Sequence, residues 1–295
     1  MIPQGAALLR LGRAIALATL CVSSLCLTAP VDAQEENSPK PPFITTPVNV
    51  AERMLALAGT RADDIVVDLG SGDGRIVINA ATQFGARGIG LELDPALVEK
   101  SLANARSAGV ADRTEFRVAD VLRADFRNAA VVTAYLLPWL LGKLGTTLLY
   151  DLRPGTRIVT HAFVLAGWQP DRSETVIVTA PDPKAGASTT IHLWTVPAKV
   201  RGDWRAEFEE SATAGKSMPG SLTIRQSFQE LDIAGSTAEG ARLTGSGRVD
   251  GLRVTFSAGT ATRKWTFSGR SDGELLRGTL AADESAALRV TLRRR

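Results

Sequence analysis

The stretch Val67–Arg75, which reads VDLGSGDGR, has the composition of a loop that holds an anionic group. It follows the apolar run Ile65–Leu69 and precedes the helical pattern Arg75–Phe84, so the free N–H groups of a helix N-terminus lie beside it. Glycine lets the backbone approach a ligand without an intervening Cβ. A dinucleotide loop, G-x-G-x-x-G/A, ends in glycine or alanine where this sequence has Arg75, which counts against a nicotinamide cofactor. A glycine turn that only links strand to helix is the alternative.

Two acidic residues follow the next two predicted strands. Glu92 comes after the strand Arg87–Leu91, and Asp120 comes after the strand Glu115–Val118. In an open parallel sheet, ligands bind at the carboxyl ends of the strands, where the glycine loop also lies. A carboxylate at Glu92 can accept both hydroxyls of a ribose, and Asp120 is within reach of an adenine edge. Either acid alone could be a solvated loop residue, but together they predict a ligand site.

The elements that must position these residues alternate between strands and helices. This alternation predicts βαβ units and a parallel sheet with helices on both faces, an α/β Rossmann-like fold. Thr46 is expected to cap the first helix, with Pro47 in its first turn. The predicted strands are Ile65–Leu69, Arg87–Leu91, Glu115–Val118, Ala130–Leu136 and Arg157–His161, and the predicted helices are Pro47–Leu55, Arg75–Phe84, Pro95–Ala108 and Trp139–Leu152.

The pattern changes after the fifth strand. Glu174–Thr179 and Thr190–Val196 are β-rich runs with no helix between them, so a hairpin is expected whose last strand is antiparallel to the rest of the sheet. After Pro197, short alternating runs separated by glycine turns predict a small all-β domain, either a barrel or a sandwich. These runs are Leu222–Gln226, Leu252–Phe256, Lys264–Phe267 and Leu288–Leu292.

Over residues 43–197 these features resemble class I S-adenosylmethionine-dependent methyltransferases. More narrowly, the stretches TTP at 45–47, GDGRIV at 72–77 and YLLP at 135–138 resemble a bacterial set related to mitochondrial protein-lysine methyltransferases. The resemblance implies S-adenosyl-L-methionine as cofactor and a protein lysine amine as acceptor. It implies that the loop glycines face the methionine half, Glu92 the ribose, and Asp120 with Val121 the adenine. The implied cofactor contacts are Thr46, Asp68, Gly70, Ser71, Gly72, Asp73, Gly74, Glu92, Leu93, Asp120 and Val121.

Three residues are candidates for the acceptor side. Tyr135, at the end of the fourth strand, is expected nearest the transferred methyl, with Pro138 shaping the acceptor channel; the alternative is that Tyr135 is a core aromatic. His161 could accept the acceptor's proton. The position of Tyr135 departs from the Asn/Asp-Pro-Pro-Tyr motif of enzymes that methylate amino groups of nucleic acids, which counts against a nucleic-acid substrate. Neither His161 nor His192 has a partner at metal-ligand spacing, so no metal is predicted.

The first residues predict export. Arg10 and Arg13 precede the uncharged run Ala14–Leu27, and Val31-Asp32-Ala33 resembles a signal-peptidase site. Both cysteines, Cys21 and Cys26, lie in this run, so the rest of the chain has no thiol chemistry. We therefore expect a periplasmic or envelope-associated protein, with an uncleaved N-terminal anchor as the alternative. The net charge of +3 over 295 residues is too small to indicate a nucleic-acid binder.

The sequence thus divides into a signal peptide at 1–33, a flexible leader at 34–42, a methyltransferase-like domain at 43–200 and an all-β domain at 201–295. Two functions remain open at this point. The first is methyl transfer from S-adenosylmethionine to a protein. The second is an exported, non-catalytic binding protein that keeps the fold and recognises an envelope partner through its β-domain. The oligomeric state is left open by the sequence.

Overall fold

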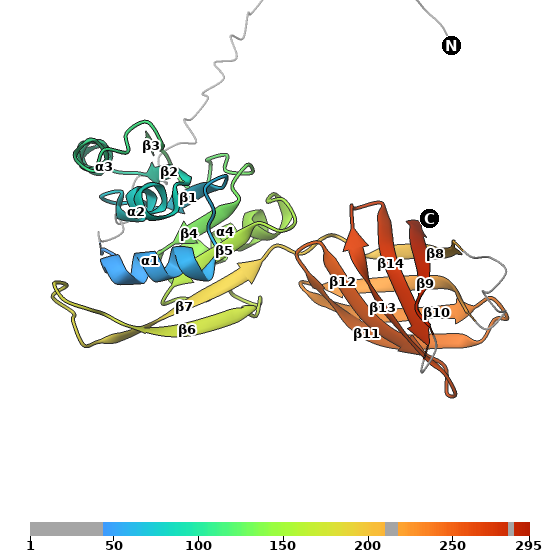
Figure 1. The fold of residues 1–295 in the computed structure, drawn as a ribbon. Helices are drawn as coiled ribbons and strands as arrows, with labels where there is room; N and C mark the ends of the chain where they lie inside the picture. Colours follow the sequence, from blue (N-terminus) through green and yellow to red (C-terminus); the bar gives the residue numbers. More distant parts are fainter. Residues whose placement is uncertain (1–43, 210–217, 283–285) are drawn as a thin grey trace, which may run out of the picture. The chain divides into compact units, whose positions relative to one another are not determined.

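The computed structural model describes residues 44–209, 218–282 and 286–295. They contain a seven-stranded mixed sheet with its helices, followed by a closed barrel (Figure 1). The predicted signal peptide and leader, at 1–33 and 34–42, lie outside these residues. No helix within the described ranges is long and apolar enough to cross a membrane.

The sheet has the strand order β3-β2-β1-β4-β5-β7-β6. Strands β1 to β5 pair in parallel, and β7 runs antiparallel to both β5 and β6. The predicted parallel sheet with a closing antiparallel hairpin is therefore confirmed. Its strands are β1 (Ile65–Leu69), β2 (Arg87–Glu92), β3 (Thr114–Val118), β4 (Val131–Ala134), β5 (Arg157–His161), β6 (Arg172–Ile177) and β7 (Ser188–Thr195).

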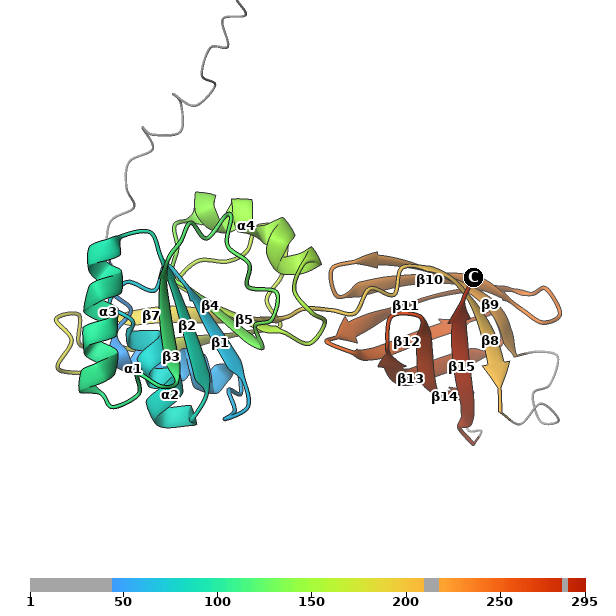
Figure 2. The ribbon, with the colours of Figure 1, turned by 90° about the horizontal axis from the view of Figure 1, so that it is seen from above.

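Helices cover both faces of this sheet, as Figure 2 shows. Side chains of a strand alternate between faces, so Val66 packs in one apolar cluster with α1 and α2 while its neighbour Val67 packs in another with α4. Both clusters are almost fully buried, which fixes the register of the central strands. The helices are α1 (Val48–Leu57), α2 (Arg75–Phe84), α3 (Pro95–Ser107) and α4 (Pro138–Tyr150).

The start of α1 corrects one expectation. Pro47 occupies the N-cap, and no side chain caps this helix. The hydroxyl of Thr46 is instead buried, with its Oγ1 atom 3.2 Å from Nδ1 of His161 on β5. Thr46 thus bonds the distant His161 in place of capping the helix, because the buried imidazole of His161 needs a hydrogen-bond partner.

The C-terminal strands form a closed antiparallel barrel, which decides between the barrel and the sandwich. Inward-facing side chains of alternating residues, among them Trp204, Trp265 and Phe267, form its buried apolar core. The strands are β8 (Gly202–Phe208), β9 (Pro219–Ser227), β10 (Glu230–Thr237), β11 (Arg242–Asp250), β12 (Arg253–Gly259), β13 (Lys264–Ser271), β14 (Leu275–Ala282) and β15 (Leu288–Arg294).

Candidate active site

The glycine loop between β1 and α2 uses a backbone that other residues adopt only with strain. Gly70, Gly72 and Gly74 have φ angles of 75°, 57° and 80°. A Cβ atom added to Gly74 would lie 2.7 Å from the ring of Phe116, and one added to Gly70 would lie 2.8 Å from Leu136. The loop therefore requires glycine both for its conformation and for its close contacts.

Three side chains hold this loop in place. Ser101 Oγ donates to the carbonyl of Gly72, and Asn104 Nδ2 donates to the carbonyl of Asp73, both at 2.9 Å. Arg75 forms a fork on the Asp73 carboxylate through Nε at 2.9 Å and Nη2 at 2.7 Å. Burial raises the pKa of Asp73, but the Arg75 fork outweighs it and holds the pKa below its usual range. Neither Ser101 nor Asn104 was expected from the sequence, because their contacts join positions far apart in the chain.

Arg75 also connects the loop to the segment before α1. Its Nη1 atom donates to the carbonyl of Thr46 at 2.9 Å. Arg75, which stands where a dinucleotide loop has glycine or alanine, thus has a structural task of its own. Asp73 is predicted to contact the cofactor, and the structure shows that its carboxylate is already committed to Arg75.

Glu92 is fixed at the carboxyl end of β2, beside the glycine loop. Its Oε2 atom accepts from the N–H of Gly72 at 2.9 Å, and its Oε1 atom accepts from the N–H of Asp94 at 3.0 Å. Each carboxylate oxygen retains a lone pair. The half-buried carboxylate is therefore preorganised to accept further hydrogen bonds from a pair of hydroxyl groups.

Asp68 is a buried acid at the end of β1. Its Oδ1 atom accepts from the Thr133 hydroxyl on β4 at 2.7 Å. Burial is the largest effect on Asp68 and raises its pKa to about 7. The hydrogen bond from Thr133 opposes this rise, and the nearby charges of Glu92 and Asp73 add a smaller increase. Among the described residues no basic side chain pairs with it. A cationic group brought beside Asp68 would favour its ionised form.

The remaining predicted cofactor contacts lie along the same edge of the sheet. Asp120 is exposed, and its Oδ1 atom accepts from the N–H of Leu122 at 2.9 Å. Val121 is buried, whereas Leu93 is 54% exposed beyond the end of β2. The hydroxyl of Ser71 is buried and has no hydrogen-bond partner within the described chain; it lies where a Cβ on Gly90 would be 2.6 Å away.

Two of the three predicted acceptor residues, Tyr135 and His161, meet at the ends of β4 and β5. The ring centroids of Tyr135 and His161 are 4.0 Å apart, and those of Tyr135 and Phe163 are 6.4 Å apart. Both nitrogens of His161 have hydroxyl partners, Thr46 Oγ1 at 3.2 Å and Thr189 Oγ1 at 2.9 Å. Pro138 is exposed at the first position of α4, close in sequence to Tyr135.

His161 is a neutral support in this arrangement. Burial, with a smaller contribution from the charge of Lys184, lowers the pKa of His161 to about 4. A general base works best with a pKa near the working pH. The geometry therefore favours His161 as a residue that supports the Tyr135 ring over the predicted role of proton acceptor.

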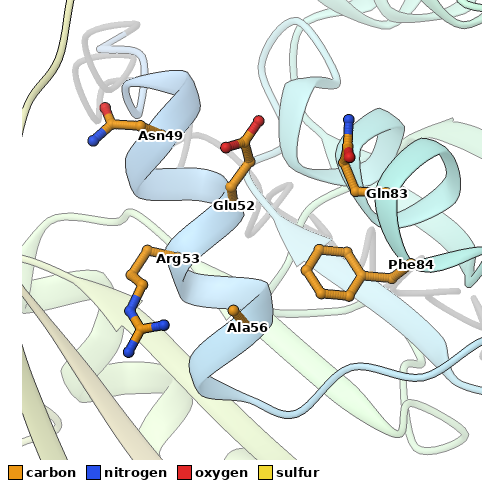
Figure 3. Close-up of a pocket in the computed structure, with 6 residues that line it drawn as sticks. All are labelled: Asn49, Glu52, Arg53, Ala56, Gln83 and Phe84. Carbon is orange, nitrogen blue, oxygen red and sulfur yellow. The ribbon is translucent and has the colours of Figure 1, made fainter.

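A surface hollow of about 360 Å³ lies elsewhere, between α1 and the last turn of α2 (Figure 3). The glycine loop begins α2, whereas this hollow contacts its final residues, about 15 Å along a ten-residue helix. It takes no part in the site at the sheet edge. Its lining residues are Asn49, Glu52, Arg53, Ala56, Gln83 and Phe84.

The chain is similar to known methyltransferases. Residues 68–172 match the model of the ANTKMT methyltransferase domain. A protein-lysine N-methyltransferase from Saccharolobus islandicus is 40% identical over 133 residues, which cover 45% of this chain and 83% of that enzyme. An adenine nucleotide translocase lysine N-methyltransferase from Mus musculus is 36% identical over 130 residues, which cover 44% of this chain and only 56% of that enzyme.

A solved structure is also similar. An RNA methyltransferase from Salinibacter ruber, in complex with S-adenosyl-L-homocysteine, is 47% identical and has a TM-score of 0.48. The match covers 53% of this chain and 96% of that one. All of these matches leave out about half of this chain or more.

The glycine loop, the acidic residues at the ends of successive strands and the sheet order define a class I methyltransferase. The chain belongs to the methyltransferase family of the Saccharolobus enzyme and is an S-adenosylmethionine-dependent methyltransferase. Nothing in the comparisons supports the alternative of a non-catalytic binding protein.

The residues at this edge fit the cofactor. S-adenosylmethionine carries two positive charges, on its sulfonium and ammonium groups, and Asp68 is a buried carboxyl group with no cationic partner in the described chain. Its ribose offers two hydroxyls, and Glu92 is held by two backbone N–H groups with acceptor capacity to spare. Asp68 would therefore face the cationic methionine part of the cofactor, and Glu92 would hold its ribose.

Proposed function

We propose that this enzyme methylates the amine of a lysine side chain in a protein. The observation that carries the proposal is the uncharged aromatic group of Tyr135, His161 and Phe163 at the sheet edge that also bears the cofactor residues. Aromatic faces attract a lysine ammonium, and a neutral imidazole does not repel it. The relatives from Saccharolobus and mouse are both named as lysine N-methyltransferases, which supports the same acceptor.

The chemistry asks little of the protein beyond placement. When bound, S-adenosylmethionine supplies a methyl group already activated by its positively charged sulfur. A lysine that arrives as an ammonium must first give its proton to water. The side chains then hold the neutral amine in line with that methyl group, and such placement is worth several kcal/mol of a reaction barrier. Tyr135 and Pro138 are the residues we assign to this task, with His161 as the support of Tyr135.

We also propose that the enzyme works outside the cytoplasm, in the periplasm or at the envelope. The basis is the sequence of the first 33 residues, where Arg10 and Arg13 precede an uncharged run and a small-residue cleavage site. Cell fractionation of a C-terminally tagged chain tests this. A mature N-terminus at Gln34 in the periplasmic fraction is expected, and a full-length chain in the cytoplasm would overturn it.

The methyl acceptor can be identified by labelling. Purified protein is incubated with tritiated S-adenosylmethionine and an envelope extract from cells that lack the gene, and the labelled protein is hydrolysed to amino acids. We expect the label in methyl-lysine, with no incorporation by the Glu92→Ala variant. Label that resists protease and is released by nuclease would instead show a nucleic-acid acceptor.

A further inference from the structure

The loop between β5 and β6, residues 162–171, begins at the candidate acceptor side with a strained turn. Ala162 has a φ of 67°, and the N–H of Phe163 donates to the carbonyl of His161 at 2.8 Å, which makes a γ-turn of the rare, positive-φ form. Such a conformation persists only where the surroundings hold it. Phe163 stacks on Tyr135, so the first residues of this loop belong to the aromatic group Tyr135, His161 and Phe163, which we call the acceptor wall.

The far part of the same loop is held by the barrel, within the compact unit Pro42–Arg295. Trp168 is buried, and its Nε1 donates to Oε1 of Gln229 at 2.7 Å. Gln229, itself 3% exposed, donates through Nε2 to the carbonyl of Gln169 at 3.2 Å and to Oδ1 of Asp171 at 3.0 Å. Every hydrogen bond that the structure shows for the side-chain amide of Gln229 is therefore made to a residue of the loop 162–171.

The barrel residue beside Gln229 is strained as well. Phe228 and Gln229 form the two-residue turn between β9 and β10, and Phe228 has a φ of 52° where glycine or asparagine is preferred. Its ring stacks on Trp168 with centroids 5.8 Å apart and an interplanar angle of 14°. Ala162 and Phe228 are the two non-glycine residues with a positive φ in the described chain. Ala162 begins the loop 162–171, and Phe228 contacts Trp168 in the far part of the same loop.

We propose that the barrel braces the acceptor wall of the methyltransferase site, with Gln229 as a positioning residue that acts through Trp168 on the loop 162–171. The proposal rests on the proposed function in that it takes the Tyr135 side as the acceptor side. It gives the all-β domain a task in building the site, where the sequence predicts only partner recognition. Arg248 of β11, whose Nη2 contacts Oδ1 of Asp171 at 2.5 Å, adds a second hold on the end of the loop.

Histidine titration by NMR tests the brace without any acceptor. The chain has two histidines, so His192 serves as an internal reference for His161. In the native protein His161 is expected to stay neutral down to about pH 5, in keeping with its pKa of about 4. In Gln229→Met, which keeps the side-chain volume but loses the hydrogen bonds, water reaches the loosened turn. We expect the pKa of His161 to rise by one unit or more, toward its ordinary value of 6.5.

Two further variants separate positioning from general destabilisation. Phe228→Gly relieves the positive φ and removes the ring stacked on Trp168, so it should also raise the pKa of His161 even where the melting temperature is unchanged. Thr223→Ala removes a barrel hydrogen bond to Asp203 that lies away from the loop, and it should leave His161 as it is. S-adenosyl-L-homocysteine should bind all three variants with native affinity, because Asp68 and Glu92 are untouched.

An unchanged pKa of His161 in both Gln229→Met and Phe228→Gly would overturn the brace. An equal rise in Thr223→Ala would also overturn it, since the effect would then report stability alone. If His161 responds as expected but no methyl-lysine forms with any protein extract, the brace stands and the lysine proposal fails.

Discussion

The Asp68 carboxyl group on β1 accepts a hydrogen bond from the Thr133 hydroxyl on β4 at 2.7 Å, in a position that buries both side chains. Thr133 lies directly opposite Asp68 in the parallel register of the two strands. One hydrogen bond is modest compensation for a buried charge, so the group remains protonated up to about pH 7. The inner strand β1 thus carries an acid whose ionised form a cationic ligand would stabilise.

Replacing Asp68 by Asn should stabilise the ligand-free protein while it weakens cofactor binding. The folded-state pKa of about 7 lies above the unfolded value, so the native state binds the extra proton and loses stability as pH rises from about 4 to 7. At about 1.4 kcal/mol per unit, the loss is at most about 4 kcal/mol. By differential scanning calorimetry, we expect Asp68→Asn to melt up to about 10 °C higher than the native protein at pH 8 and at nearly the same temperature at pH 4.

The glycines at the two ends of α2 offer a matched pair of substitutions. Gly74 and Gly85 both have positive φ, at 80° and 67°, so alanine costs about 1–2 kcal/mol at either position. Only at Gly74 does the new Cβ clash, at 2.7 Å from Phe116, whereas at Gly85 it meets Ala62 at 3.4 Å. Gly74→Ala should therefore abolish binding of S-adenosyl-L-homocysteine, and Gly85→Ala should retain it. Equal affinities in the two variants would show that the loop does not hold the cofactor.

A buried neutral His161 makes a specific prediction for the pH profile of methyl transfer. Because its folded pKa of about 4 lies below the unfolded value of 6.5, it should add acid sensitivity to folding below about pH 6.5, with no titration in the rate above it. His161→Gln should lower the transfer rate about tenfold, less than the 10²–10⁴-fold loss of a general base. A larger loss, together with the disappearance of a rate inflection near pH 7, would restore His161 as the base.

The parts of the site that were predictable from the sequence are those that depend on local pattern. The glycine loop, Glu92 and Asp120 each follow a recognisable strand, and the carboxyl ends of parallel strands meet at one edge. Tyr135 and His161 were expected at the same edge for the same reason, and the structure places their rings 4.0 Å apart. The cofactor and acceptor roles of these residues remain predictions that the variants above test.

The contacts that hold the site could not be read from the sequence. Thr133, Ser101 and Asn104 are ordinary residues of a strand and a helix, and their partners lie 65, 29 and 31 positions away. The same holds for Gln229, which stands in a turn with no local signal and meets Trp168 at a separation of 61 residues. Thr46 looked like a helix cap because the cap pattern is local, whereas its actual partner is His161.

Binding of S-adenosylmethionine by Glu92 and its neighbours at the sheet edge is the central claim about how this enzyme works. Isothermal titration of the purified protein with S-adenosyl-L-homocysteine measures this binding, with Glu92→Ala as the variant and Glu99→Ala, an exposed acid on α3, as the matched control. We predict one binding site in the native protein and in Glu99→Ala, and at least a tenfold weaker affinity in Glu92→Ala. No heat of binding in the native protein, or equal affinities in the two variants, would contradict this assignment of the cofactor site.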